Sequence, residues 1–283
     1  MFNRHAFRIA VVGATGAALA VGMTPLASAA SSPKTASAPK PTVVLVNGAW
    51  SDPASWSGVI KRLQTKGYPV TAPPTALRSL SDDSAYLASY LKTIQGPIVL
   101  VGHSYGGSVI TNAATDNAKV KALVYISAFA PDKGESVVDL TAKFPGTHIT
   151  TDPHAAIPTA LTPVPFTLAD GSTGVDLYAR ADKYRDLFLS DRLGNKVAAE
   201  LAATQSPAAP HALDEASGAP AWKTIPSWYL VSNDDHLIPP AAQRFMAARA
   251  RAHTVKADTP HAAQVVNPEI VTNLIEQAAA TTR

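Results

Sequence analysis

The stretch GHSYGG, residues 102–107, places a single serine among three glycines directly after the apolar run IVLV. Gly102, Ser104 and Gly106 match the pattern G-x-S-x-G, in which a sharp turn between a strand and a helix displays a serine hydroxyl. Ser104 could instead simply cap a helix. The apolar run before the motif and the helical pattern after it are the context that the turn requires. We therefore predict that Ser104 is a nucleophile.

A serine hydroxyl attacks efficiently only when a base takes its proton, and a histidine oriented by an acid is a common base. On turns of this kind the acid and then the histidine follow the serine along the chain. His261 comes after the last predicted strand, and Asp234 and Asp235 follow the strand before it. Asp132, after the fourth predicted strand, is a further candidate for the acid. This order of residue types predicts a Ser-Asp-His triad.

Six apolar runs that alternate with helical patterns are the elements that must position these residues. The predicted strands are residues 42–46, 68–72, 98–101, 122–127, 227–231 and 253–257. Ser55 and Ser81 are the predicted caps of the first two helices, and Asn267 with Pro268 begins the last. The alternation predicts an α/β fold with a doubly wound, mostly parallel six-stranded sheet. Sites in such sheets lie beyond the carboxyl ends of the strands, where the candidate residues fall.

Residues 131–223 break this alternation, with many prolines and no clear buried strand. Two helices are predicted there, around residues 175–189 and 196–204. Six aromatic residues between Phe144 and Trp222 argue against disorder, because disordered segments contain few aromatic residues. We expect a cap over the strand ends, inserted between the fourth and fifth strands at approximately residues 133–222.

Beyond the motif, the chain resembles the α/β-hydrolases. Within them it is most similar to the compact group of plant methyl esterases and hydroxynitrile lyases, with its secreted bacterial esterase relatives. The resemblance runs from Thr42 to the C-terminus and rests on the segments LVNGAW, VGHSYGG, FAPDKGES, WYLVSNDDHLIPP and TPHAAQVVNPEIV. It implies that the acid is Asp235, four residues before Pro239, rather than Asp234 or Asp132.

An oxyanion hole needs two backbone N–H donors, one of them from the residue after the nucleophile, which is Tyr105. The resemblance implies that Ala49, in the loop after the first strand, supplies the other. Relatives usually have histidine at the position of Asn47, and we expect the Asn47 side chain to hold this loop in shape.

The resemblance implies a serine esterase that forms an acyl-enzyme intermediate. A hydroxynitrile lyase on the same scaffold is an alternative, but in the resembling lyases a lysine closely follows the catalytic histidine. Here Ala262, Ala263 and Gln264 follow His261. A ligand-binding protein that kept the fold is a second alternative, because fold does not determine function.

The N-terminal residues predict export. Arg4 and Arg8 precede an apolar stretch that is too short to span a bilayer and that ends in the small-residue pattern ASA at Ala29. We expect residues 1–29 to be a cleaved signal peptide, residues 30–41 a flexible linker and residues 42–283 the hydrolase domain of a secreted protein. No other segment has the length and apolarity of a membrane span.

Composition narrows the expected partners. Arg4 and Arg8 account for two of the 24 basic residues, which leaves 22 basic against 21 acidic residues and gives no support for nucleic acid binding. There is no cysteine, phosphate-binding glycine motifs are absent, and the spacing of His148, His154 and His211 resembles no metal site. We expect no cofactor and no metal, and a small, largely apolar ester as substrate. The oligomeric state stays open.

Overall fold

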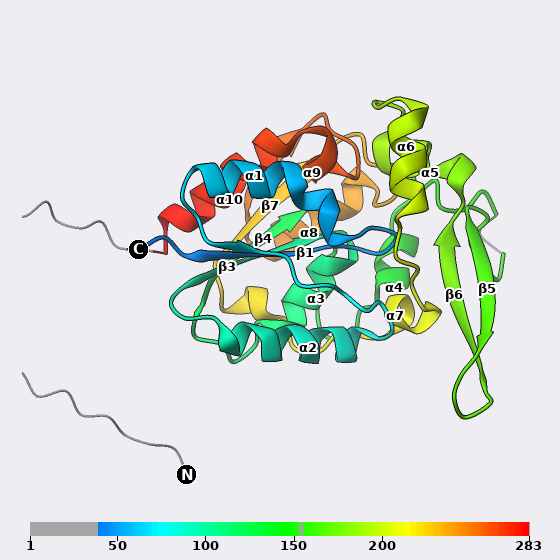
Figure 1. Ribbon diagram of the computed structural model, residues 1–283, viewed down its shortest axis with the longest axis horizontal. Coiled ribbons are helices and arrows are strands. Elements are labelled where there is room, and N and C mark those ends of the chain that lie inside the picture. The colour runs from blue at the N-terminus through cyan, green and yellow to red at the C-terminus, as the bar shows by residue number, and fades with distance from the viewer. Residues whose placement is uncertain (1–38, 153–154, 283) are drawn as a thin grey trace, which may run out of the picture. The chain divides into compact units, whose positions relative to one another are not determined.

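The computed structural model of the protein describes residues 39–152 and 155–282. Its main sheet has six parallel strands in the order β2-β1-β3-β4-β7-β8 (Figure 1). The strands are β1 (Thr42–Val46), β2 (Val70–Thr71), β3 (Ile98–His103), β4 (Val120–Ile126), β7 (Ser227–Ser232) and β8 (His253–Ala257). All six predicted strands are confirmed. The predicted signal peptide, and the predicted linker up to residue 38, lie outside the described residues.

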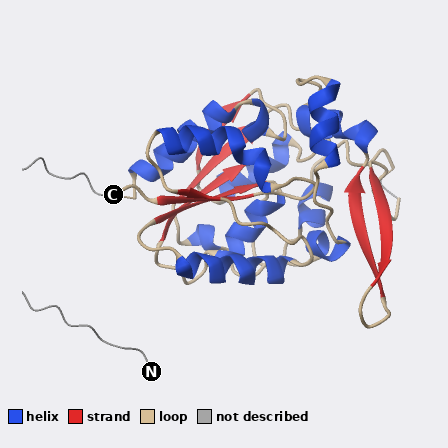
Figure 2. Cartoon of the chain, viewed as in Figure 1, coloured by secondary structure: helices blue, strands red, loops and turns tan. Residues whose placement is uncertain are grey.

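Helices cover both faces of this sheet, as a doubly wound fold requires (Figure 2). One face carries α1 (Ser57–Thr65) and α10 (Pro268–Ala280), which contact each other. The other face carries α2 (Leu80–Thr93), α3 (Tyr105–Ala113) and α8 (Pro240–Arg249). Asn267 caps α10 by accepting the backbone N–H of Ile270, as its position before Pro268 predicts.

The two faces exist because side chains alternate along each strand. Val43 and Leu45 of β1 belong to the apolar core beneath α1 and α10, while Val44 and Val46 belong to the core on the opposite face. Since both faces are covered, consecutive residues of a central strand are all buried, which explains the uninterrupted apolar runs in the sequence.

Two helix caps differ from the prediction. Asp52, rather than Ser55, begins the first helical segment: its carboxylate accepts the N–H groups of Ala54 and Ser55 and starts a 3₁₀ turn (η1, Pro53–Trp56) that leads into α1. Ser79, rather than Ser81, caps α2 by accepting the N–H of Asp82. In both cases a polar residue slightly earlier in the chain reaches the free N–H groups of the first turn.

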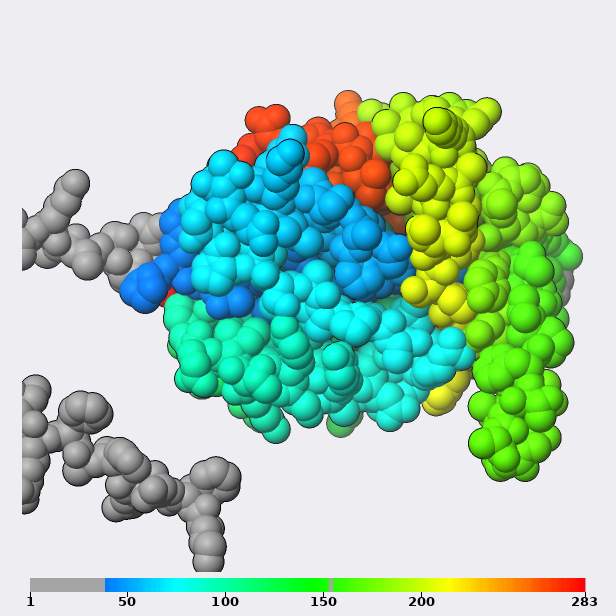
Figure 3. Space-filling model, in the orientation of Figure 1, coloured from blue at the N-terminus to red at the C-terminus, as the bar shows by residue number. Residues whose placement is uncertain are grey.

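The chain between β4 and β7 forms the predicted insertion. It contains α4 (Val137–Ala142), β5 (Leu161–Thr167), β6 (Thr173–Ala179), α5 (Ala181–Leu189), α6 (Asn195–Ala203), α7 (Pro210–Asp214) and the 3₁₀ turn η2 (Ala221–Lys223). The predicted helix at residues 196–204 is confirmed as α6. In Figure 3 the insertion, coloured green to yellow, covers one end of the molecule.

The helix predicted at residues 175–189 is wrong in its first part. Residues 175–179 belong to β6, which pairs antiparallel with β5 in a separate two-stranded sheet. The inward side chains of β6 recur at every second residue, Leu177 and Ala179 being buried, and this period indicates a strand. Within the described residues, no helix has the length and apolar composition needed to cross a membrane.

Candidate active site

Ser104 lies at the turn between β3 and α3. Its backbone angles, φ 55° and ψ −128°, are unusual for a residue with a Cβ and cost on the order of 1–3 kcal/mol. The turn is tight because glycines surround it: a Cβ on Gly102 would lie 2.5 Å from the carbonyl oxygen of Gly106, and a Cβ on Gly106 would lie 2.6 Å from that of Val46. The strained, glycine-lined turn presents Ser104 to a cavity above the sheet.

Asp235 and His261 meet beyond the ends of β7 and β8. His261 Nδ1 lies 2.8 Å from Asp235 Oδ2, and both side chains are fully buried. His261 Nε2, the second ring nitrogen, has no hydrogen-bond partner among the described residues. The ring also lies beside the serine turn, since it is 4.7 Å, between ring centroids, from the ring of His103, the residue before Ser104.

Asp235 is held rigidly by three further donors. The backbone N–H groups of Leu237 and Ile238 each donate to Oδ1 at 2.8 Å, and the Gln243 amide donates to Oδ2 at 2.7 Å. Sequence reasoning missed Gln243. One signal could have found it: Gln243 precedes Met246 by one helical turn, so it shares the buried face of α8, where a polar side chain needs a partner.

The other two candidate acids lie elsewhere. Asp234 accepts two hydrogen bonds from the Arg192 guanidinium, at 2.8 and 2.9 Å. Asp132 pairs with Lys223 at 2.6 Å, and the hydrogen bond from Lys223 is the main reason that the pKa of Asp132 lies below its usual value. Of the three aspartates that the sequence offered, the structure brings only Asp235 into contact with His261.

Ala49 and Tyr105 are both buried and line the cavity that Ser104 faces. Their backbone N–H groups make no hydrogen bond to another described residue. Asn47 holds the Ala49 loop as expected, because its amide donates to the carbonyl oxygens of Gly48 and Ser51 at 3.1 and 3.0 Å. Both residues line the same cavity as Ser104, and their N–H groups are available to an outside acceptor.

A buried hydrogen bond anchors the Tyr105 side chain away from this point. Its hydroxyl donates to Asp83 Oδ2 at 2.8 Å, and Asp83 Oδ1 accepts the N–H groups of Ala76 and Leu77 at 3.1 Å each. Burial, and then the nearby Asp83 charge, raise the pKa of Tyr105, so the phenol stays protonated. Sequence reasoning also missed Asp83.

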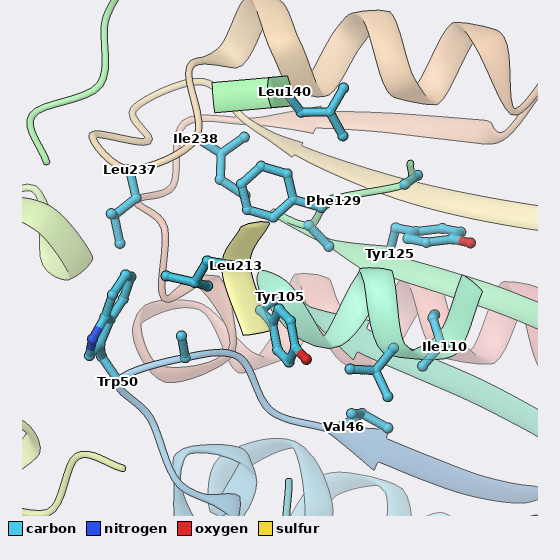
Figure 4. Packing of buried hydrophobic residues seen from close by; sticks show 14 of the residues in the cluster. Val46, Trp50, Tyr105, Ile110, Tyr125, Phe129, Leu140, Leu213, Leu237 and Ile238 are labelled. Atoms are coloured by element: carbon cyan, nitrogen blue, oxygen red, sulfur yellow. The ribbon is translucent and has the colours of Figure 1, made fainter. Parts of the chain in front are cut away.

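The cavity has a volume of about 690 Å³ and lies between the strand ends and the insertion. Its lining is largely apolar and includes Phe129, Leu213, Leu237 and Ile238, which Figure 4 shows gathered near Tyr105. The insertion contributes much of the wall through α4, the segment that follows it, and α7.

The insertion is tied directly to the candidate site. The Trp50 indole N–H donates to the Leu177 carbonyl of β6 at 2.8 Å, and the Tyr184 hydroxyl of α5 donates to the Trp50 carbonyl at 2.8 Å. Phe188 of α5 meets the His261 ring edge-on, with 5.6 Å between ring centroids. The insertion therefore covers His261 and shields the Asp235–His261 pair from water.

The remaining histidines correct one expectation. Burial, followed by the neighbouring His261, lowers the pKa of His103 well below its usual range, so His103 is neutral. The spacing of His148 along the sequence indicated no metal site, and His236 was not singled out as a ligand. Instead both lie against Asp186, with one possible ligand atom of each of the three residues within 4.8 Å of the others. The sequence separations of 38 and 50 residues concealed this cluster.

Residues 43–272 match the alpha/beta hydrolase family. This chain belongs to that family. The match extends from β1 into α10, so it includes the whole main sheet, the insertion and every residue of the candidate site. The resemblance expected from the sequence is confirmed at this level.

Two curated proteins show what this hydrolase is similar to. It is 29% identical to the pyrethroid hydrolase of Sphingobium wenxiniae over 219 residues. This alignment covers 72% of this chain and 74% of that protein. It is 34% identical over 113 residues to the carbendazim hydrolyzing esterase of Nocardioides sp. (strain SG-4G), which covers 35% of this chain. That alignment spans 47% of the esterase, about half its length.

Solved structures confirm the fold. Polyneuridine aldehyde esterase superposes with a TM-score of 0.69 at 18% identity, covering 84% of this hydrolase and 98% of that chain. A methylesterase from Arabidopsis gives 0.67 at 16% identity, covering 85% and 99%. At these identities the likeness concerns the fold alone. It agrees with the expected similarity to plant methyl esterases.

Proposed function

We propose that this hydrolase cleaves carboxylic esters with Ser104 as nucleophile, His261 as general base and Asp235 as the acid that orients His261. The observation that carries the proposal is the fully buried 2.8 Å contact between Asp235 and His261 Nδ1, beside a strained turn that presents a serine. Neighbouring groups fix Asp235, so the imidazole has one orientation and Nε2 is left to exchange protons.

The reaction then follows in two steps. His261 Nε2 takes the Ser104 proton while Oγ attacks the ester carbonyl carbon, and the N–H groups of Ala49 and Tyr105 stabilise the negative charge on the former carbonyl oxygen. The alcohol leaves with the proton from His261, and an acyl-enzyme remains. Water, deprotonated by His261, attacks this ester, and Ser104 leaves with the proton as the carboxylic acid is released. Each step uses residues of this chain and water.

The proposed substrate is a small, largely apolar ester. The cavity of about 690 Å³ beside Ser104 has the size and lining of a small-molecule site. Relatives named for pyrethroid and carbendazim hydrolysis are consistent with such a substrate.

Turnover of a short-chain aryl ester tests the proposed activity. We expect steady release of p-nitrophenol from p-nitrophenyl butyrate, first order in enzyme and above the rate of the ester in buffer. Saturable binding of the ester without turnover would instead indicate a ligand-binding protein that kept the fold.

The cavity predicts a substrate-length effect. Thr141 of α4 lines the cavity and is partly exposed, so Thr141→Phe adds a ring to the wall without filling the core. We expect kcat/KM for p-nitrophenyl octanoate to fall at least about tenfold more than kcat/KM for the acetate, because only the long acyl chain meets the ring. Ser89→Phe on the exposed side of α2, away from the cavity, is the matched control. We thereby infer that the wall at Thr141 faces the acyl chain, and an equal loss for both esters in Thr141→Phe would contradict this.

We also propose export of the protein. The basis is the sequence of residues 1–29, with residues 30–41 as a linker to a hydrolase domain at residues 42–283. N-terminal sequencing of protein from the culture medium should begin near Ala30 or Ser31. Secreted protein that still begins with Met1 would exclude cleavage at this position.

A further inference from the structure

His148, Asp186 and His236 come from three separate segments and converge at one point beside the candidate active site. His148 follows α4, Asp186 lies in α5 and His236 is next to Asp235 in sequence. His148 Nδ1 lies 3.0 Å from Asp186 Oδ2, and His236 Nδ1 lies 2.6 Å from Asp186 Oδ1. Both imidazoles thus present the same ring nitrogen to a single carboxylate.

Further contacts fix the positions of the two rings. The His148 backbone N–H donates to the His236 carbonyl at 2.7 Å, and the two rings stack at 4.1 Å between centroids. The other nitrogen of His236, Nε2, lies 3.7 Å from Asp234 Oδ1, while Arg192 holds Asp234 through its second oxygen. His236 is therefore flanked by a carboxylate on each side.

We propose that His148 Nδ1, His236 Nδ1 and an Asp186 carboxylate oxygen bind one divalent transition-metal ion, Zn²⁺ being the best match. Two imidazoles and a carboxylate are ligands that zinc binds at 2.0–2.2 Å in a tetrahedral site, with water as the fourth ligand. Ligand atoms of such a site are about 3.3–3.5 Å apart. The three atoms already lie within 4.8 Å of one another, so a small outward rotation of the Asp186 carboxylate makes room for the ion.

Two features of the surroundings suit a metal ion. Zinc binds neutral imidazoles, so two rings stacked at 4.1 Å can hold one ion without repulsion between like charges. Metal-bound histidines commonly donate their other ring N–H to a carboxylate, and Asp234 Oδ1 lies 3.7 Å from His236 Nε2, from where a small shift would make this hydrogen bond.

The ion would connect the insertion to the core. His148 and Asp186 belong to the insertion, and His236 belongs to the loop that carries Asp235. A bound metal would join these parts by coordinate bonds and so stabilise the cover over the cavity. Zinc affinity is measured on the protein itself, so the test of this site does not depend on the proposed esterase activity.

Calorimetric titration with ZnCl₂ tests the site. The protein is prepared without a histidine tag, treated with EDTA and dialysed. We expect one Zn²⁺ to bind per chain and the thermal unfolding temperature to rise when Zn²⁺ is in excess, because the ligand binds only the folded state. His148→Gln and His236→Gln should each weaken the affinity at least about tenfold.

His211→Gln is the matched control, because His211 also lies in the insertion and contacts a carboxylate, that of Asp214, outside the cluster. It should bind Zn²⁺ like the unaltered protein. His148 is half exposed, so its variant should fold even if the His236 variant does not. Absence of stoichiometric binding, or equal affinity in His148→Gln and the unaltered protein, would overturn the proposal and leave a cluster of hydrogen-bonded ion pairs.

Discussion

Ser104→Ala is expected to lower kcat on p-nitrophenyl butyrate by about a million-fold while leaving the protein folded, the loss seen when a serine protease loses its nucleophile. The substitution removes the atom that forms the acyl-enzyme. It disturbs the fold little, because the Ser104 hydroxyl makes no hydrogen bond to another described residue. Alanine must adopt the same positive φ, so the strain of the turn is unchanged. Initial rates and thermal unfolding measured by circular dichroism check both statements.

Ser108→Ala is the matched control, one turn further along α3. Its hydroxyl is buried and unpartnered within the described chain, so its removal should leave activity and stability nearly unchanged. A fluorophosphonate should label the unaltered protein and Ser108→Ala once, on Ser104, and should not label Ser104→Ala. Labelling that persists in Ser104→Ala would show that another residue is the nucleophile.

Asp235→Asn is expected to lower kcat on the order of ten-thousand-fold, as in the corresponding change of a serine protease. Oδ1 of Asp235 accepts two backbone N–H groups, so the carbonyl oxygen of asparagine must take that place. Its NH₂ group then faces His261 Nδ1, which has to accept a hydrogen bond rather than donate one. The proton moves to Nε2, and the ring can no longer take the proton of Ser104.

Asp132→Asn and Asp234→Asn are the controls, with kcat expected to stay within about tenfold of the unaltered enzyme. Each removes an exposed ion pair, with Lys223 or with Arg192, that does not reach His261. Kinetics and the unfolding temperature are measured for all three variants. Together they distinguish a misoriented His261 ring from an unfolded protein. A near-normal kcat for Asp235→Asn together with a large loss for Asp132→Asn would move the acid to the end of β4.

Several features of this hydrolase follow from its sequence because they depend on local chemistry. Strands buried on both faces must be apolar at every position, so their runs are visible without a structure. The serine turn can be recognised in the sequence by its glycines. Backbone segments approach so closely at Gly102 and Gly106 that a Cβ has no room there. The order of Ser104, Asp235 and His261 along the chain comes from the order of the strands that carry them.

The sequence also limited the acid to three aspartates, and resemblance favoured Asp235, but contact with His261 is a matter of tertiary structure. It depends on how the loops after β7 and β8 pack together, with Gln243 and two backbone N–H groups holding the carboxylate. The catalytic roles of these residues stay predictions until the variants are measured.

Other features of the fold and of the metal-like cluster were decided only by the tertiary structure. The choice of Asp52 and Ser79 as caps depends on which side chain reaches the free N–H groups, and neighbouring polar residues competed for that place. The hairpin of β5 and β6 is largely exposed, so it lacks the apolar runs that reveal buried strands. His148, Asp186 and His236 are brought together by the packing of the insertion onto the Asp235 loop. The spacing along the chain does not show this packing, because the three residues lie on segments that are far apart in the sequence.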